Sequence, residues 1–226
     1  LVILEPDFGS AVFLLFMGVF VMWIGGARAR HLLCAFLPAM AGAAILGWTH
    51  FGHFRTRLST FMNPHADYQV RQALSALGSG GLLGQGLGNG TAKWGFLPES
   101  DDDFLFAVVG EELGLVGTAA VLALYALILW HGVRVLLGLR SRFGLVAGAG
   151  LLLQVVVQAV LNVAVVTAVA PNKGLPLPFV SAGGTSMVVL CISVGLLLGL
   201  ARAPEEDPVL EARWATSLTH RGEPGA

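Results

Sequence analysis

The sequence predicts an all-α membrane protein, a polytopic helical bundle with about five transmembrane helices and one long loop outside the bilayer. Hydrophobic residues make up 55% of the 226 residues and charged residues only 12%, about half of what soluble domains carry. The mean hydropathy is +0.76. The apolar residues also gather into five separate runs. The net charge of −1 gives no reason to expect a nucleic-acid partner.

Each apolar run is close to the ~20 residues that cross a bilayer as an α-helix. The runs cover residues 11–27, 32–48, 104–130, 143–170 and 185–201. We therefore expect residues 1–202 to form one membrane domain. Cys34 and Cys191 lie inside two of these runs, with no second ligand nearby, and we interpret them as packing residues. The chain begins at Leu1 without a basic region or cleavage site typical of a signal peptide, which favours a fragment of a longer protein.

Basic residues in short loops favour the cytoplasmic side of a membrane. If five helices alternate, six arginines fall on one side: Arg28, Arg30, Arg134, Arg140, Arg142 and Arg202. The opposite side then carries the loop at 51–102 and the connection around Lys173. The sequence therefore predicts that both of these segments face outward. The tail at 203–226, which contains "PEEDP" and few apolar residues, is expected to be cytoplasmic and disordered.

The long loop is rich in cations, aromatic residues and glycine. Seven glycines lie between Gly78 and Gly90, a density that permits unusual backbone angles or a close approach to another group. The pattern does not match a P-loop. Two interpretations stay open: a re-entrant or interfacial loop with glycines for tight packing, and a loop that cradles a ligand.

Three consecutive aspartates, Asp101, Asp102 and Asp103, precede the third apolar run. One acidic group would satisfy a helix N-terminus. Three adjacent carboxylates repel one another, which predicts a raised pKa for at least one of them and makes the cluster a candidate proton acceptor or cation site. The alternative is a solvated acidic cap.

Further polar residues lie within the apolar runs. Glu111 and Glu112 are about two turns into the third run, where carboxylates are costly without a polar cavity or a partner. On the fourth run Gln154, Gln158 and Asn162 recur every four residues and share one helix face. We interpret the third and fourth helices as the walls of a polar cleft. Hydrogen bonds that only join helices are the alternative.

The stretch "APNKGLPLPFVSAGGTS", residues 170–186, follows the fourth run and contains three prolines and three glycines. Lys173 and the hydroxyls of Ser181, Thr185 and Ser186 could meet a phosphate or a sugar there. The alternative is a simple turn between helices.

Three of these stretches together resemble the SEDS family (shape, elongation, division and sporulation proteins), which includes FtsW, RodA and the sporulation paralogue. "EPDFGSA" resembles that family's Q-P-D-L-G-T-A segment. Residues 68–114, from "YQVRQ" to "GEELG", resemble its central signature, and "PNKGLPLPFVSAGGTS" resembles its P-x-K-G-L-x-L-P-F-x-S-Y-G-G-S-S loop. Members have about ten membrane helices, so the resemblance implies that this chain is the C-terminal half.

The resemblance implies a peptidoglycan glycosyltransferase of the bacterial cytoplasmic membrane that polymerises lipid II at the outer face, with a class B penicillin-binding protein as partner. Asp103 matches the family's essential aspartate and is the predicted general base, with inversion at the anomeric carbon. A divalent cation, Mg²⁺ or Mn²⁺, is the cofactor to consider, with the three aspartates as candidate ligands. The predicted substrate-binding residues are Arg57, Gln69, Lys93, Glu99, Glu112, Lys173 and Ser181.

The chain departs from the family pattern at several positions. Asp101 and Asp102 replace a histidine and a threonine, Ala182 replaces a tyrosine, and Thr185 replaces a serine. These changes bear on substrate or partner preference more than on the fold. Two other functions compete with polymerisation: a lipid II flippase, because carriers are also built around polar clefts and broken segments, and a non-catalytic membrane scaffold for a penicillin-binding protein.

Overall fold

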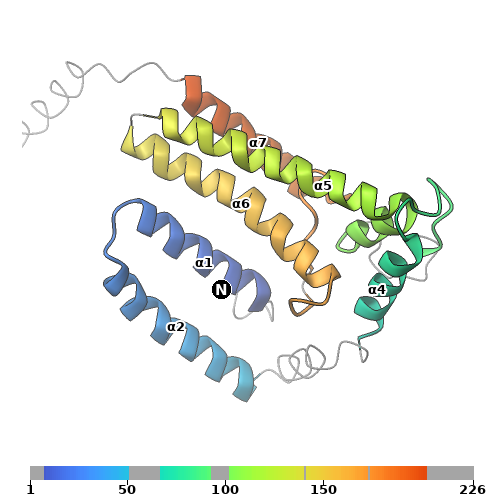
Figure 1. Ribbon diagram of the computed structural model, residues 1–226. Helices are drawn as coiled ribbons and strands as arrows, with labels where there is room; N and C mark the ends of the chain where they lie inside the picture. Colours follow the sequence, from blue (N-terminus) through green and yellow to red (C-terminus); the bar gives the residue numbers. More distant parts are fainter. Residues whose placement is uncertain (1–7, 51–66, 93–101, 140, 173, 203–226) are drawn as a thin grey trace, which may run out of the picture.

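The computed structural model describes residues 8–50, 67–92, 102–139, 141–172 and 174–202. These residues form helices joined by loops, and no strand occurs among them (Figure 1). The helices are α1 (Phe8–Ile24), α2 (Ala29–His50), α4 (Tyr68–Gly80), α5 (Leu105–Gly138), α6 (Arg142–Val166) and α7 (Gly184–Arg202). Five of the six overlap the five predicted apolar runs. The helical membrane bundle predicted from the sequence is therefore confirmed.

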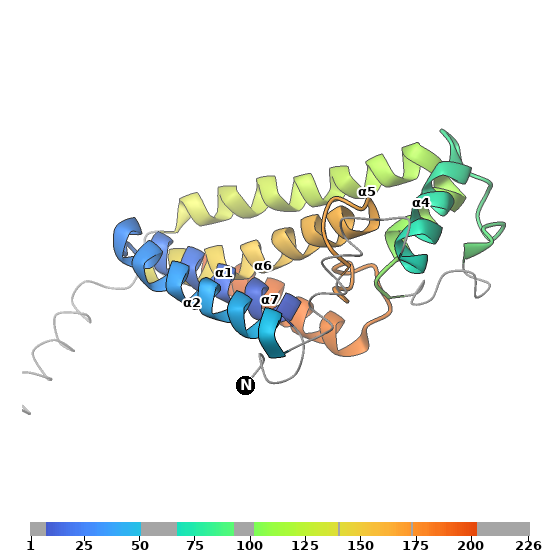
Figure 2. The same ribbon diagram turned by 90° about the horizontal axis from the view of Figure 1, so that it is seen from below.

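The helices pack around α6, which contacts α1, α4, α5 and α7, while α2 packs on the outside of α1. Figure 1 shows the α1–α2 turn, the α5–α6 turn and the end of α7 at one end of the bundle. We call this the arginine end, because the described arginines at 28, 30, 134, 142 and 202 belong to it. The opposite end, which we call the loop end, carries α4, the loop 81–92 and the connection 167–183 (Figures 1 and 2). Five of the six arginines predicted to share one side thus lie opposite these segments, and the sixth, Arg140, lies outside the described residues.

Among the described residues, α5, α6 and α7 are long and apolar enough to cross a membrane, and a shorter apolar helix runs from Ser10 to Ile24 in α1. Large apolar side chains on the outside of the bundle are exposed, as expected for a surface that faces lipid; examples are Leu124, Trp130 and Ile192. That α1 and α2 also span the bilayer stays a prediction. Cys34 and Cys191 are exposed as well, so their interpretation as packing residues is wrong.

The helix α4 lies within the segment that the sequence predicted to be one long loop. Its N-cap is Asp67, whose carboxylate accepts a hydrogen bond of 2.9 Å from the backbone N–H of Gln69. Its buried residues, among them Ala73 and Ala76, recur at helical spacing and pack against α5. The helix was not predicted because glycine and serine near its end mask a short amphipathic pattern.

The helix α5 is interrupted at Gly114, where the backbone takes φ 66° and ψ −161°. The break leaves backbone groups on both sides without helical partners. The loop 81–92 supplies them: the N–H groups of Gln85 and Gly86 donate to the carbonyls of Glu111 and Glu112, and the N–H groups of Leu115 and Val116 donate to the carbonyls of Gly81 and Leu82. The sequence analysis did not anticipate this break in the third apolar run.

Several glycines of the loop end are required by this close packing. A Cβ on Gly84, which has φ 80°, would lie 2.1 Å from the carbonyl oxygen of Glu112, and a Cβ on Gly80 would lie 1.9 Å from that of Gly110. A Cβ on Gly90 would lie 2.9 Å from Oε2 of Glu111. Of the two interpretations left open for the glycines, these contacts favour tight packing against α5.

Candidate functional site

The first element of the site is the side chain of Asn162, which joins the aspartate segment to the proline-rich connection. Asn162 is 2% exposed, and its Nδ2 donates hydrogen bonds of 2.7 Å to both the Asp103 and the Leu175 carbonyls. Its Oδ1 is the buried side-chain atom in the described residues without a hydrogen-bond partner. A buried amide that binds two loops at once fixes their relative position, because losing either bond leaves a polar group unsatisfied.

The second element is Ser181, which is also buried. Its hydroxyl donates to the carbonyl oxygen of Asp102 and accepts a hydrogen bond of 2.8 Å from the N–H of Leu177. Gln158 and Tyr125 add two bonds to the same connection, at the carbonyls of Pro176 (2.9 Å) and Pro178 (2.5 Å). The connection 167–183 is therefore fixed by side chains from α5 and α6.

Asp102 and Asp103 lie in the turn before α5 and do not occupy its capping position. The N-cap is Phe104, which makes no side-chain cap hydrogen bond and is 1% exposed in the core of the loop end. Asp102 and Asp103 are both partly exposed. A Cβ on Gly174 would lie 3.0 Å from Oδ2 of Asp103, so the carboxylate of Asp103 packs against a residue that has no side chain.

A third contact joins the connection to α4. Nδ2 of Asn172 donates a hydrogen bond of 2.7 Å to Oε1 of Gln69 and one of 3.3 Å to Oδ2 of Asp67. The first turn of α4 therefore lies beside the residue that precedes Lys173. Gln69, Asp103 and Ser181 come from three distant parts of the sequence, and this network brings the segments that carry them to one end of the bundle.

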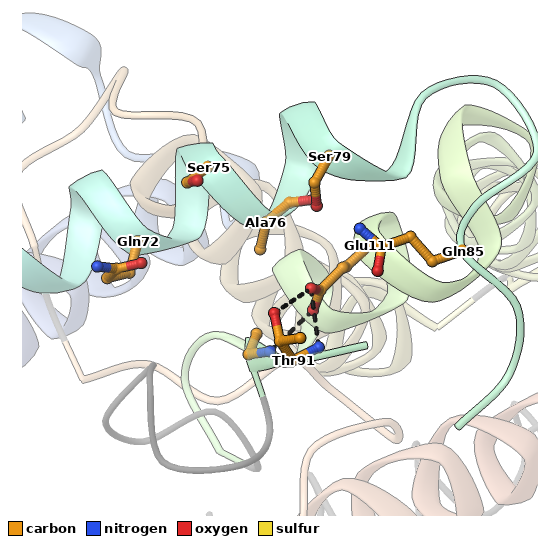
Figure 3. Close-up of a pocket in the computed structure, with 8 residues that line it drawn as sticks. Gln72, Ser75, Ala76, Ser79, Gln85, Thr91 and Glu111 are labelled. Carbon is orange, nitrogen blue, oxygen red and sulfur yellow. Dashed lines mark hydrogen bonds between the residues drawn. The ribbon is translucent and has the colours of Figure 1, made fainter. Parts of the chain in front are cut away.

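Glu111 is buried, with 2% exposure, and its carboxylate holds the end of the glycine-rich loop. Oε1 accepts hydrogen bonds of 2.9 Å from the N–H and the hydroxyl of Thr91, and Oε2 accepts one of 3.0 Å from the N–H of Ala92. Figure 3 shows the carboxylate pointing at this segment. The expectation that a carboxylate here needs a polar partner is confirmed for Glu111.

Beside Glu111 lies a pocket of about 270 Å³. Residues of α4, the glycine-rich loop and α5 line it (Figure 3): Gln72, Ser75, Ala76, Ser79, Gln85, Thr91, Ala92 and Glu111. Apart from the Glu111 carboxylate, its polar groups are uncharged amides and hydroxyls, which suit hydrogen bonding to a neutral polar group. The structure thus places this pocket between α4 and α5, whereas the sequence pattern predicted a polar cleft between the third and fourth helices. Gln158 and Asn162 of the predicted stripe instead bind carbonyls of the connection 167–183. These bonds join a helix to a loop, whereas the alternative interpretation expected bonds between helices.

Five predicted site residues lie outside the described part of the chain: Arg57, Lys93, Glu99, Asp101 and Lys173. Glu112 is among the described residues. Its backbone carbonyl accepts a hydrogen bond from the Gly86 N–H, and its side chain lies beside Gly90. The hydroxyl of Ser181 has protein partners on both sides, so its role in substrate binding stays a prediction.

Two residues of the network were not predicted from the sequence. Thr91 and Asn172 have no local pattern that distinguishes them from other polar residues in loops. Their partners, Glu111 and Gln69, are separated from them by 20 and 103 residues. Only the tertiary contacts identify them.

The apolar helices packed around α6 define a polytopic membrane protein. Its candidate site lies at the loop end, where buried amide and hydroxyl groups join two polar loop segments. Residues 1–206 match the family FTSW_RODA_SPOVE, described as cell cycle proteins. The chain belongs to this family, and the resemblance to SEDS proteins is confirmed.

Curated relatives support the same assignment. The chain is 33% identical over 208 residues to stage V sporulation protein E of Bacillus subtilis, which covers 89% of this chain and 56% of the relative. It is 43% identical over 210 residues to the probable peptidoglycan glycosyltransferase FtsW of Nitrosococcus halophilus, covering 88% of this chain and 53% of that protein. The corresponding protein of Coxiella burnetii is 38% identical over 215 residues.

A solved structure has the same fold. It is described as "Structural coordination of polymerization and crosslinking by a peptidoglycan synthase complex", and it matches with a TM-score of 0.70 and 27% sequence identity. The match covers 90% of this chain and 58% of the other chain. The chain thus spans a little more than half the length of the relatives it matches.

Proposed function

We propose that this chain is part of a peptidoglycan glycosyltransferase that polymerises lipid II at the outer face of the bacterial cytoplasmic membrane. Support comes from family membership, from relatives named probable peptidoglycan glycosyltransferases and from a structural neighbour described as a peptidoglycan synthase complex. In this proposal the loop end faces outward and the arginine end faces the cytoplasm, as the distribution of basic residues favours.

Asp103 is the proposed general base. Joining two lipid-linked sugars requires a hydroxyl to lose its proton as it attacks an anomeric carbon, while a lipid pyrophosphate leaves. A single displacement of this kind inverts the anomeric centre. The observation that carries the proposal is the double hydrogen bond of Asn162, which holds the Asp103 backbone beside the segment that contains Lys173. The proposal requires Lys173, which lies outside the described residues, to supply a cation for the leaving group near this base.

We assign the neutralisation of the pyrophosphate to Arg57, Lys93 and Lys173. We assign contacts to the sugar or peptide part of the substrate to Gln69, Glu99, Glu112 and Ser181. A divalent cation, Mg²⁺ or Mn²⁺, remains part of the proposal, because carboxylate oxygens are the ligands that such ions prefer. Within the described ranges no group of three or more His, Cys, Asp or Glu side chains is placed to hold a metal ion, so Asp102 and Asp103 would need ligands from the substrate or from Asp101.

The partner proposed for this chain is a class B penicillin-binding protein, since the structural neighbour is described as coordinating polymerization with crosslinking. The partner would use the glycan strands that this protein makes. Whether the complex acts in division, elongation or sporulation depends on that partner.

The experiment is lipid II polymerisation by the purified protein at its natural length, in detergent, where product formation cannot be transport. Asp103→Asn removes the base and keeps the shape of the side chain, and we expect the rate to fall by about 10²- to 10⁴-fold, the usual contribution of a general base. Asp102→Asn, assayed at saturating Mg²⁺ or Mn²⁺, is the matched control and should retain most of the rate. Equal rates for wild type and Asp103→Asn would exclude the base role. No polymer from wild-type protein, with or without the partner, would favour the flippase or scaffold instead.

A further inference from the structure

The loop 81–92 presents three leucines that are largely exposed in the described structure. Leu82 is 69% exposed, Leu83 is 82% exposed and Leu87 is 76% exposed. These values are among the highest of the large apolar side chains in the described structure. The stretch 72–92 contains no charged residue. A loop in water would be expected to contain charged or strongly polar groups at such positions.

The leucines continue a surface that already belongs to a membrane-spanning helix. The Val116 N–H donates a hydrogen bond of 3.2 Å to the carbonyl oxygen of Leu82, so Leu82 lies directly beside the start of the long part of α5. Leu115 and Val116 are each 60% exposed and begin the outer face of α5 that continues to Leu124 and Trp130. The apolar surface of the loop and that of α5 are therefore continuous.

The depth of the loop can be estimated from the length of α5 after its break. At ~1.5 Å per residue the segment 115–138 is about 36 Å long, slightly longer than the ~30 Å hydrocarbon core of a bilayer. Its first residues, and the leucines beside them, are thus expected near the boundary between acyl chains and headgroups.

The backbone of the loop is also suited to an apolar environment, where unpaired polar groups are costly. The N–H groups of Gly84, Gln85 and Gly86 donate to carbonyls of α4 and α5, and the carbonyls of Gly81 and Leu82 accept from α5. The part of the loop next to α5 therefore already has its hydrogen-bond partners within the protein.

We infer that Leu82, Leu83 and Leu87 insert into the edge of the bilayer at the loop end and anchor the glycine-rich loop to the membrane surface. The occupant of this surface is lipid. The anchor would hold α4 and the pocket beside Glu111 at the level of the lipid headgroups. This inference needs only a membrane-spanning α5 and does not depend on the proposed enzymatic activity.

The test is spin labelling of single cysteines in liposomes, with collision rates measured for oxygen, which dissolves in lipid, and for a water-soluble nickel chelate. The exposed native cysteines are first replaced, as Cys34→Ala and Cys191→Ala. Leu83→Cys and Leu87→Cys are the test positions. Leu124→Cys in α5 is the lipid control, and Asn89→Cys, exposed on the same loop, is the water control.

If the loop is inserted, labels at 83 and 87 will collide with oxygen severalfold more often than with nickel, as at 124, while the label at 89 will show the reverse ratio. Frequent nickel collisions at 83 and 87 would place the leucines in water and overturn the inference. Low rates for both reagents would show that another protein segment covers them, which overturns it equally.

Discussion

Nδ2 of Asn162 lies 2.7 Å from the carbonyl oxygen of Asp103 and the same distance from that of Leu175. One buried amide on α6 therefore fixes the proposed base and the proline-rich connection relative to each other. This geometry makes Asn162 a positioning residue, because its Nδ2 donates to two backbone carbonyls of the protein.

Replacing Asn162 should therefore disturb the position of the proposed base without removing the base itself. Asn162→Ala leaves two carbonyls without their donor, which we expect to cost roughly 1–3 kcal/mol of stability and to lower the polymerisation rate with little effect on KM. Thermal unfolding in detergent and lipid II kinetics measure the two effects. Gln154→Ala, on the same face of α6 and two turns away, is the control. Unchanged rate and stability in Asn162→Ala would contradict the positioning role.

Glu111 should contribute to stability through its three hydrogen bonds. Hydrogen bonds to charged groups are worth roughly 1.5–3 kcal/mol, and in Glu111→Gln the amide nitrogen must face an N–H of Thr91 or Ala92. We expect a loss of about that size, measured by thermal unfolding. Thr91→Ala, which removes one of the three bonds, should lose less, and Thr91→Ser should behave as wild type. A Glu111→Gln protein as stable as wild type would show that the carboxylate does not hold the loop.

Replacing glycines of the loop end with alanine should change the stability in a direction that depends on the space around each glycine. Gly84→Ala places a Cβ 2.1 Å from a carbonyl oxygen at φ 80°, and the left-handed backbone alone costs an L residue roughly 1–2 kcal/mol. Gly78 lies in α4 with nothing within 4 Å of its Cβ position, so Gly78→Ala should gain about 0.5–1 kcal/mol. Unfolding temperatures of the two variants should move in opposite directions. A shared direction would argue against the close packing of this loop on α5.

Removal of divalent cations tests the cofactor. If Asp102 and Asp103 hold Mg²⁺ or Mn²⁺ together with the substrate, chelation with EDTA should stop polymerisation, and added Mg²⁺ or Mn²⁺ should restore it. The Asp102→Asn variant should then need a higher cation concentration for half of its maximal rate, because one ligand is lost. An EDTA-treated protein that works at full rate would remove the cation from the mechanism.

The sequence alone determined the class of fold, the approximate helix positions and the family. An apolar run of about 20 residues predicts a helix without knowledge of the rest of the fold, because a segment in lipid must form its own backbone hydrogen bonds. The arginines at 28, 134 and 202 likewise indicated which ends of the helices lie together. The motifs around Asp103 and Lys173 indicated the family, because each is a continuous stretch of the chain whose residue order can be read directly.

Only the tertiary structure decided how the loops are held. Gly114 looks like any other glycine in an apolar run, and its break is explained only by the loop 81–92, which supplies the missing hydrogen bonds. The polar stripe on α6 was correctly recognised, but its role was not, because Asn162 binds a carbonyl 59 residues away. Such contacts depend on which distant segments meet, and a periodic pattern reports only which face of its own helix is apolar or polar.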